Sequence, residues 1–331
     1  MTTTATRPES STRQHHLVGL VSAFGIGMLV AVQSRLNGEL GGLLGDGIPA
    51  ALISFGSGLL ILLVATALVP RVRRGLGNVW RAIRTPMRGY GGLRWWQCIG
   101  GVAGAFLVAT QSITVSVIGV AVFLVAGVAG QAISSLAMDR LGFGPAGPQP
   151  LTAVRIVGAL VALVAVGLAV SEQLSHPDGL VLAVLPALAG VGTAVQQAIN
   201  GRVARTASSD AYGAVAAGVV NFLVGFVALL LVFLVDLAVR GVPNALPNEP
   251  WLYLGGACGV IFISAAAAVV RVVGVFVLGL GTIAGQLIAS LFIDVFLPVA
   301  DKPVTTPVVA GTLLALAAVL IAAVPNLRGT P

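Results

Sequence analysis

Long apolar runs separated by short polar connections extend along almost the whole chain. Ten of these runs are about 20 residues long, which is the length that a helix needs to cross the hydrocarbon core of a bilayer. The third and fourth runs are nearly continuous, as are the eighth and ninth, and we divide them near Thr114 and Arg271. The pattern therefore predicts ten membrane-spanning helices, at residues 17–36, 48–70, 95–113, 115–138, 151–171, 180–200, 212–237, 251–269, 272–296 and 304–325.

Polar segments remain at both ends of the chain. Residues 1–16 carry Arg7 and Arg13 and are rich in Thr and Ser. The apolar run behind them is too long for the core of a cleaved signal peptide, so we predict an uncleaved first span that follows a disordered cytoplasmic tail. Residues 326–331 form a short C-terminal tail.

Composition narrows the class of protein. Hydrophobic residues make up 57% of the 331 residues and charged residues only 9%, against about 25% charged residues in ordinary soluble domains. An all-α polytopic membrane protein fits this balance. The net charge of +7 does not indicate nucleic-acid binding, because the arginines lie between apolar runs and not on one soluble face.

The basic residues predict the orientation of the chain, because cytoplasmic loops collect Lys and Arg. With ten spans and both termini in the cytoplasm, 15 of the 18 basic residues lie on the inner side. Only Arg35, Arg240 and Lys302 then lie on the outer side. This asymmetry favours both the number of spans and the inward placement of the two termini.

The inner connection from Arg71 to Arg94 holds seven arginines together with Trp80, Trp95 and Trp96. Basic residues near a membrane surface attract anionic lipid, so this loop is a candidate docking surface for lipid headgroups. The simpler interpretation is a topology anchor flanked by aromatic residues of the interface. Both interpretations remain open at this point.

Two sequence signatures each occur twice. The segment "AVQSRLNGEL" at 31–40 corresponds to "AVQQAINGRV" at 194–203, 163 residues further on. The segment "AGQAISSLAMD" at 129–139 corresponds to "AGQLIASLFID" at 284–294, 155 residues further on. The shift is constant within a span and changes only between spans, as expected of a duplicated helical bundle.

The duplication predicts two five-helix repeats, at 17–171 and 172–325. Because five is odd, the second repeat enters the membrane from the opposite side. The distribution of basic residues agrees with this opposite insertion. The connection after the second span is rich in arginine in the first repeat and carries only Arg240 in the second. Inverted repeats related by a pseudo-two-fold axis in the membrane plane are typical of secondary transporters.

The repeated residues also resemble a known family. The order of Gln33-x-x-x-Asn37, then "AALISFGSG" at 50–58, then a Gly-Gly pair, then "AGQ" leading to Asp139, is similar to the YdcZ-like branch of the drug/metabolite transporter superfamily. The resemblance covers both copies. It implies a ten-helix transporter fold in a bacterial inner membrane and a role as an exporter, without naming a substrate.

The two copies differ at some equivalent positions. Asn221 stands where the first copy has Ser54, and Arg271 stands where it has Ser116. The halves are therefore not interchangeable, and we include Ser54 and Asn221 among the candidate substrate-binding residues.

Gln131 and Gln286 are equivalent residues that we expect near the bilayer midplane. Gln131 precedes Asp139 by eight residues, or about 12 Å along a helix, and the half-thickness of the core is about 15 Å. Two amides meeting at this depth could bind a solute. An interhelical amide hydrogen bond is the structural alternative.

The pairs Gln33/Asn37 and Gln196/Asn200 each share one helix face, because their members are four residues apart. An Asn-Gly pair ends helices well, which explains the asparagines structurally. It explains the glutamines less well, because an unpaired amide in hydrocarbon is costly. We predict that these glutamines line the outer and inner mouths of the transport pathway.

Asp139 and Asp294 are candidate proton carriers, because intramembrane carboxylates mark proton relays. Both fall at predicted helix ends, where a charge is also tolerated without a relay. The glycine pairs of the two copies predict close helix packing. These pairs are Gly100/Gly104 and Gly255/Gly259.

Together these features predict a secondary-active transporter that exports a small metabolite or drug-like solute by alternating access. A flippase for a lipid-linked metabolite and a channel or structural membrane protein remain alternatives. An enzyme is not predicted, because His15, His16 and His176 all lie in polar segments and the chain has no P-loop, GxSxG or HExxH motif. We predict no cofactor or metal, and one chain with both halves suits a functional monomer.

Overall fold

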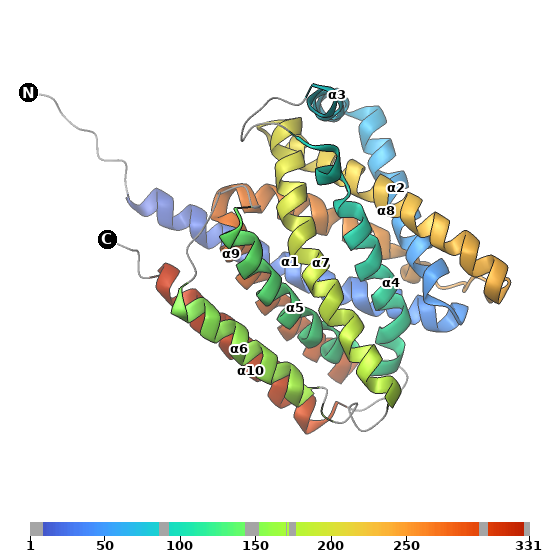
Figure 1. Cartoon of the computed structure of the whole chain (residues 1–331), viewed down its shortest axis with the longest axis vertical. Helices are drawn as coiled ribbons and strands as arrows, with labels where there is room; N and C mark the ends of the chain where they lie inside the picture. Colours follow the sequence, from blue (N-terminus) through green and yellow to red (C-terminus); the bar gives the residue numbers. More distant parts are fainter. Residues whose placement is uncertain are drawn as a thin grey trace, which may run out of the picture.

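The computed structural model describes residues 9–85, 93–142, 152–169, 171, 177–297 and 304–327 (Figure 1). The described part of the chain forms α-helices and two short 3-10 turns, at Trp95–Cys98 and Pro250–Leu254. The α-helices are α1 Glu9–Leu44, α2 Gly47–Leu68, α3 Pro70–Arg84, α4 Gly100–Ile118, α5 Val120–Arg140, α6 Ala153–Ala169, α7 Pro177–Ala207, α8 Ala211–Arg240, α9 Gly255–Phe296 and α10 Thr306–Leu327.

Seven helical segments among the described residues are long and apolar enough to cross a membrane. Shorter apolar segments lie in α6, at Ile156–Ala169, and in α10, at Thr306–Ala318, and α7 is not among the seven. These seven segments coincide with seven of the ten predicted spans and support an all-helical membrane protein. The seven are Val18–Leu44, Gly47–Leu68, Trp95–Ile118, Val120–Met138, Ala211–Arg240, Pro250–Val269 and Leu278–Phe296.

The outward faces of these helices are apolar. Leu60 and Val64 on α2, and Leu231 and Val235 on α8, all expose more than half of their surface. Exposed apolar surface of this extent is unfavourable in water, whereas hydrocarbon accommodates it. The surface of the bundle is therefore suited to lipid.

The break between α4 and α5 lies at Gly119, five residues beyond the predicted division at Thr114. Thr114 lies inside α4, where its hydroxyl is satisfied within the helix by donating to the carbonyl oxygen of Thr110, one turn earlier, at 2.7 Å. Gly119 ends α4 with a φ of +81°, a conformation that glycine adopts without strain.

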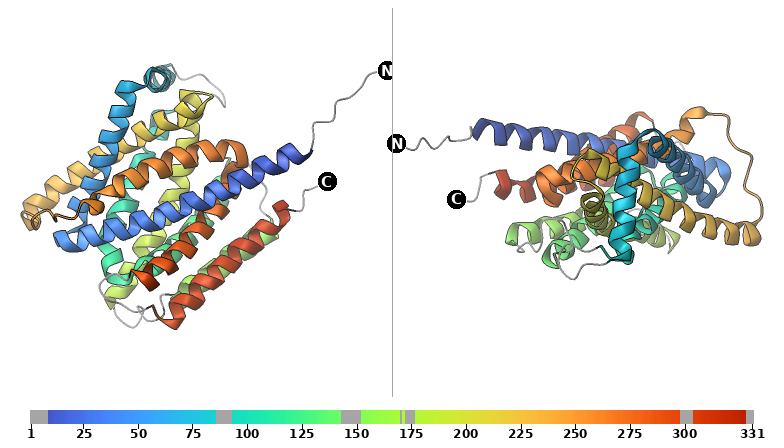
Figure 2. Two further views of the ribbon diagram at one scale, coloured as in Figure 1. Left: turned by 180° about the vertical axis from the view of Figure 1, so that it is seen from behind. Right: turned by 90° about the horizontal axis from the view of Figure 1, so that it is seen from above.

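The helix α9 doubles back on itself. Its helical hydrogen bonding continues through Arg271, where the sequence predicted a division. A straight helix of 42 residues would be about 63 Å long. Yet Gly255 at its start lies against Asn37, and Leu297 just after its end accepts a hydrogen bond from Arg35 Nε at 3.2 Å. The spans Pro250–Val269 and Leu278–Phe296 are thus two separate legs beside the same part of α1 (Figure 2).

The predicted loop after the second span contains a helix, α3. Its buried residues are Val72, Gly75 and Val79, spaced three and four residues apart as on one helix face. Figure 1 shows α3 end on, at the edge of the bundle and across the direction of α4. The arginine-rich connection is therefore in large part an amphipathic helix and not a loop.

The structure describes part of the predicted N-terminal tail. Helix α1 begins at Glu9 and so includes residues 9–16 of this segment. Residues 1–8 and 328–331 lie outside the described residues.

The first helix of each half packs on the other half. The helix α1 contacts both legs of α9, and its counterpart α7 contacts α4 and α5, which are the counterparts of those legs. The pairs α2 with α8 and α6 with α10 join equivalent helices (Figures 1 and 2). The two halves of the chain are therefore crossed over one another along most of their length.

Candidate functional site

The second half holds a buried cluster of three amides. Gln196 Nε2 and Asn200 Nδ2 on α7 both donate to Oδ1 of Asn221 on α8, at 2.9 and 3.0 Å. All three side chains are at most 6% exposed. Asn221 thus joins the two helices, and the predicted residues come together here as one network.

The first half holds a different network around the equivalent residues. Asn37 Nδ2 donates to Oε1 of Gln111 at 3.0 Å, and Gln111 Nε2 donates to Oγ of Ser34 at 2.9 Å. Gln111, on α4, is fully buried. Gln111 could not be found from the repeat, because the position equivalent to it in the second copy is Ala266.

The glycines of the repeated motifs meet these amides across the two halves. A Cβ added to Gly104 would lie 2.2 Å from Gln196 Nε2, and one on Gly259 would lie 2.9 Å from Gln33 Nε2. Gly100 likewise lies beside Asn200 Oδ1, and Gly255 lies beside Asn37 Oδ1 and Ser54 Oγ. The absence of a side chain at these four positions lets each amide-bearing helix approach the opposite half.

Gln131 and Gln286 are both buried, at 5% exposure. No hydrogen bond joins their side chains among the described residues. The backbone nitrogen of Gln131 lies against Gly190 of α7, and that of Gln286 lies against Gly27 of α1. The two glutamines therefore occupy matching helix crossings, one in each half.

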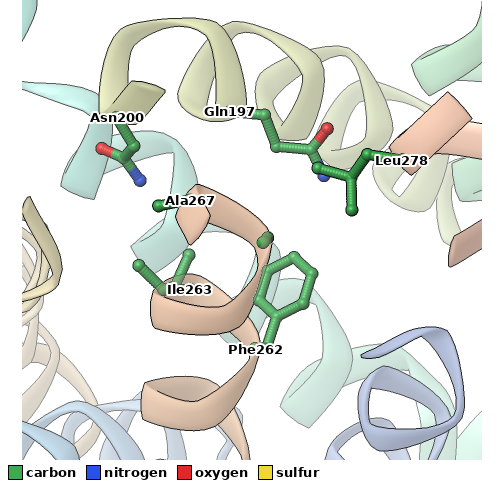
Figure 3. A pocket seen from close by; sticks show the side chains of 7 residues that line it. Gln197, Asn200, Phe262, Ile263, Ala267 and Leu278 are labelled. Carbon is green, nitrogen blue, oxygen red and sulfur yellow. The ribbon is translucent and has the colours of Figure 1, made fainter. Parts of the chain in front are cut away.

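A narrow pocket opens between α7 and α9 (Figure 3). Gln197 lies in it beside Leu278, and its Nε2 is buried without a hydrogen-bond partner. The side chain of Gln197 is only 8% exposed. The pocket is lined by Gln197, Asn200, Phe262, Ile263, Ala266, Ala267 and Leu278.

Of these lining residues, only Asn200 is among the candidates that the repeated motifs predict. The signal for Gln197 was its place directly after Gln196 in a long apolar helix. The lining is therefore apolar apart from the two amides, and none of its residues carries a charge.

Asp294 has a structural partner. Its Oδ1 accepts from the backbone nitrogen of Val120 at 3.1 Å, and its Oδ2 accepts from that of Ala121 at 2.7 Å. The carboxylate, 8% exposed, thus caps the N-terminus of α5 directly after Gly119. The side chain of Asp139, the other candidate carrier, lies outside the described residues.

Among the described residues, no group of three or more His, Cys, Asp or Glu side chains could hold a metal ion.

Comparison with known proteins gives one family. A family model described as "Putative inner membrane exporter, YdcZ", of the DMT type, matches residues 18–168 and again residues 181–321. The comparison with curated proteins gives no match. Fifteen chains of solved structures are similar, and one crystal structure among them has a TM-score of 0.57 and 18% identity over 96% of this chain and 98% of its own. At that identity the likeness concerns the fold alone.

Proposed function

Because the chain belongs to the YdcZ family of inner membrane exporters of the drug/metabolite transporter type, we propose that it exports a small solute by secondary-active alternating access. The ten helices then form two inverted five-helix repeats, with both termini in the cytoplasm. The transported molecule passes between the halves, where the amides of α1 and α7 lie against glycines of the opposite half. The protein acts as a transporter and carries out no chemical reaction.

The reciprocal packing of the two halves is the observation that carries this proposal. Helix α1 meets Gly255 and Gly259 of α9 through Gln33 and Asn37. Helix α7 meets Gly100 and Gly104 of α4 through Gln196 and Asn200. Two contacts of the same kind, one per half, have similar energies, so opening one while closing the other costs little.

The distribution of the arginines supports the placement of these two contacts at opposite ends of the pathway. The α7–α4 contact lies toward the arginine-rich helix α3, since Asn78 of α3 donates to the carbonyl oxygen of Ala207 at the end of α7. The positive-inside rule assigns that end to the cytoplasm. The α1–α9 contact then closes the outer end of the pathway.

Single-cysteine labelling tests this function without knowledge of the solute. In a variant with Cys98 and Cys258 replaced by alanine, Ala267→Cys places a thiol in the pocket. In proteoliposomes we expect a membrane-impermeant maleimide to label it from either side, because the pocket faces each side in turn. Locking α4 to α7 by Ala103→Cys and Gly192→Cys, whose Cβ atoms would be 3.3 Å apart, should abolish labelling from the cytoplasmic side only.

The same assay tests the inverted repeats. Thr85 and Leu246 lie in equivalent connections, after the second helix of each half. Cysteines at these two positions should react from opposite sides of the membrane. Reaction from the same side would rule out inversion, and pocket labelling that the α4–α7 lock leaves unchanged would rule out alternating access. Labelling only by a lipid-soluble maleimide would favour a flippase.

A further inference from the structure

The connection after the second helix is built differently in the two halves. In the first half it contains α3, which has five arginines and no acidic residue among its 15 residues. In the second half, residues 241–249 form no helix and include no basic residue. Because the second half completes the same part of the repeat without such a helix, the fold alone does not account for α3.

The length of α2 determines where α3 lies. With 22 residues, α2 is about 33 Å long, close to the thickness of about 30 Å of the hydrocarbon core. Only Val69 separates its end from Pro70, the first residue of α3. Figure 1 shows α3 end on, across the direction of α4. When α2 spans the bilayer, α3 therefore lies along the membrane surface, at the level of the headgroups.

Three contacts hold one face of α3 against the bundle. Gly75 lies against Ala207 of α7. Asn78 Nδ2 donates to the carbonyl oxygen of Ala207 at 2.9 Å. The guanidinium of Arg71 lies over the ring of Tyr212 on α8, 5.2 Å from its centre. The opposite face of α3 is thereby held outward.

This outward face surrounds Gly77. Nothing lies within 4 Å of a Cβ placed on Gly77. The guanidinium of Arg84 lies 4.4 Å from the centre of the Trp80 ring. The face thus combines several guanidinium groups with one indole ring. The residues three and four positions from Gly77 that share this face are all exposed, and they are Arg73, Arg74, Trp80 and Arg81.

The chain itself does not neutralise the charge of this face. The guanidinium of Arg73 donates to the carbonyl oxygen of Ala67, and that of Arg81 donates to Oδ1 of Asn78, so both acceptors are uncharged. Like charges close together on a helix repel one another, and an anion bound among them relieves this repulsion. Within the part of the chain that the structure describes, four arginines of the face form no salt bridge: Arg73, Arg74, Arg81 and Arg84.

We propose that this face of α3 binds the headgroups of anionic phospholipid in the membrane that the protein spans. The arginines bind the phosphate groups, because a guanidinium can donate two parallel hydrogen bonds to phosphate. The Trp80 ring, 56% exposed, occupies the interface with its apolar part toward the acyl chains. Charge complementarity selects anionic over zwitterionic lipid, and the ring selects lipid over a soluble anion.

The helical arrangement distinguishes this role from that of a topology signal. Basic residues orient a chain through their number and their side of the membrane, and an irregular loop provides both equally well. In α3 the buried residues Val72 and Val79 share one face, and the arginines and Trp80 lie outward, as in helices that lie in the interface. Lipid binding at α3 requires only that α2 spans the membrane, so it is tested independently of transport.

A matched pair of substitutions at Gly77 tests the proposal. Gly77→Glu places a carboxylate within reach of Arg73, Arg74 and Arg81, whereas Gly77→Gln adds a side chain of the same size without charge. Both residues favour helix over glycine, so α3 should remain folded in both variants. The purified protein is melted in detergent with phosphatidylglycerol or with phosphatidylcholine, because a lipid that binds the native state raises the melting temperature.

Phosphatidylglycerol should raise the melting temperature of the wild type more than phosphatidylcholine does, and about 0.5 M salt should reduce this difference. Gly77→Gln should keep the difference, as should Arg240→Gln at the exposed far end of α8. Gly77→Glu should lose about half of it or more. Glycerol phosphate, which has no acyl chains, should not reproduce it. Equal effects of the two lipids, an undiminished difference in Gly77→Glu, or the same shift with glycerol phosphate would overturn the proposal.

Fluorescence quenching locates the bound lipid. With Trp95, Trp96 and Trp251 replaced by phenylalanine, Trp80 is the single tryptophan. Proteoliposomes with equal amounts of the two lipids are prepared twice, with bromine on the acyl chains of either phosphatidylglycerol or phosphatidylcholine. Brominated phosphatidylglycerol should quench Trp80 at least about twofold more strongly, and Gly77→Glu in this background should remove most of the excess. Equal quenching by the two lipids would overturn the proposal and leave the basic face to a soluble acidic partner.

Discussion

Replacing Gly27 by alanine is expected to destabilise the protein by about 3 kcal/mol or more. A Cβ at this position would lie 2.0 Å from the carbonyl oxygen of Thr282 and 2.8 Å from the backbone nitrogen of Gln286. Backbone atoms cannot move aside as a flexible side chain can. The helices α1 and α9 would have to separate by at least about 1 Å, which would loosen a close-packed interface.

Gly25→Ala is the matched control for this prediction. Gly25 lies two residues away in the same helix, and nothing lies within 4 Å of a Cβ placed there. Alanine favours helix over glycine, so this variant should be as stable as the wild type or slightly more so. Melting of the purified variants, followed by tryptophan fluorescence, measures the difference. Equal melting temperatures for the two variants would show that the helices do not approach as closely as described.

Removing the Asp294 carboxylate is expected to be the second large effect. Asp294→Leu would leave the buried backbone N–H groups of Val120 and Ala121 without acceptors, at about 1–3 kcal/mol each. Asp294→Asn has a similar shape and can still accept one of these hydrogen bonds. The expected order of melting temperatures is therefore wild type, then Asp294→Asn, then Asp294→Leu.

This order separates the two roles considered for Asp294. A proton carrier depends on ionisation, so Asp294→Asn would abolish transport driven by a pH gradient without a loss of stability. A helix cap depends on accepting hydrogen bonds, so the same variant melts at a lower temperature. If Asp294→Asn melts at the wild-type temperature, capping does not account for the carboxylate.

Much of the fold could be predicted from the sequence, because apolar length and the repeat report it directly. The all-helical membrane class followed from the apolar runs and the low share of charged residues, and the family followed from the recurring glutamine, asparagine and glycine positions. The helix boundaries could be predicted less well from the sequence. The sequence predicts a boundary between two spans at Thr114. In an apolar environment, however, the Thr114 hydroxyl forms a hydrogen bond with the preceding helical turn, and the residue lies inside the helix.

The helix α3 was missed because its charge suggested a loop. Its pattern was nevertheless readable, since Val72, Leu76 and Val79 recur at intervals of four and three residues in the sequence. The arginines set the polarity of the segment, and the spacing of the apolar residues set its secondary structure.

The pocket could not be predicted from the repeat. Comparison of the two copies selects residues that match, such as Gln196 with Gln33, whereas the pocket lies where the copies differ. Gln197 and Ala266 replace Ser34 and Gln111, and this exchange of a long and a short side chain has a meaning only once the helices are placed side by side. Differences between the copies thus determine where the packing of the bundle leaves a pocket.

The crossing of the two halves also constrains how the protein is made. The α1 face with Gly27 is completed only by the second leg of α9, more than 250 residues further along the chain. At a synthesis rate of about 5–20 residues per second, α1 leaves the ribosome roughly ten to fifty seconds before that partner. Throughout this interval lipid or the insertion machinery must cover the waiting face, and neither half can be completed before almost the entire polypeptide has been translated.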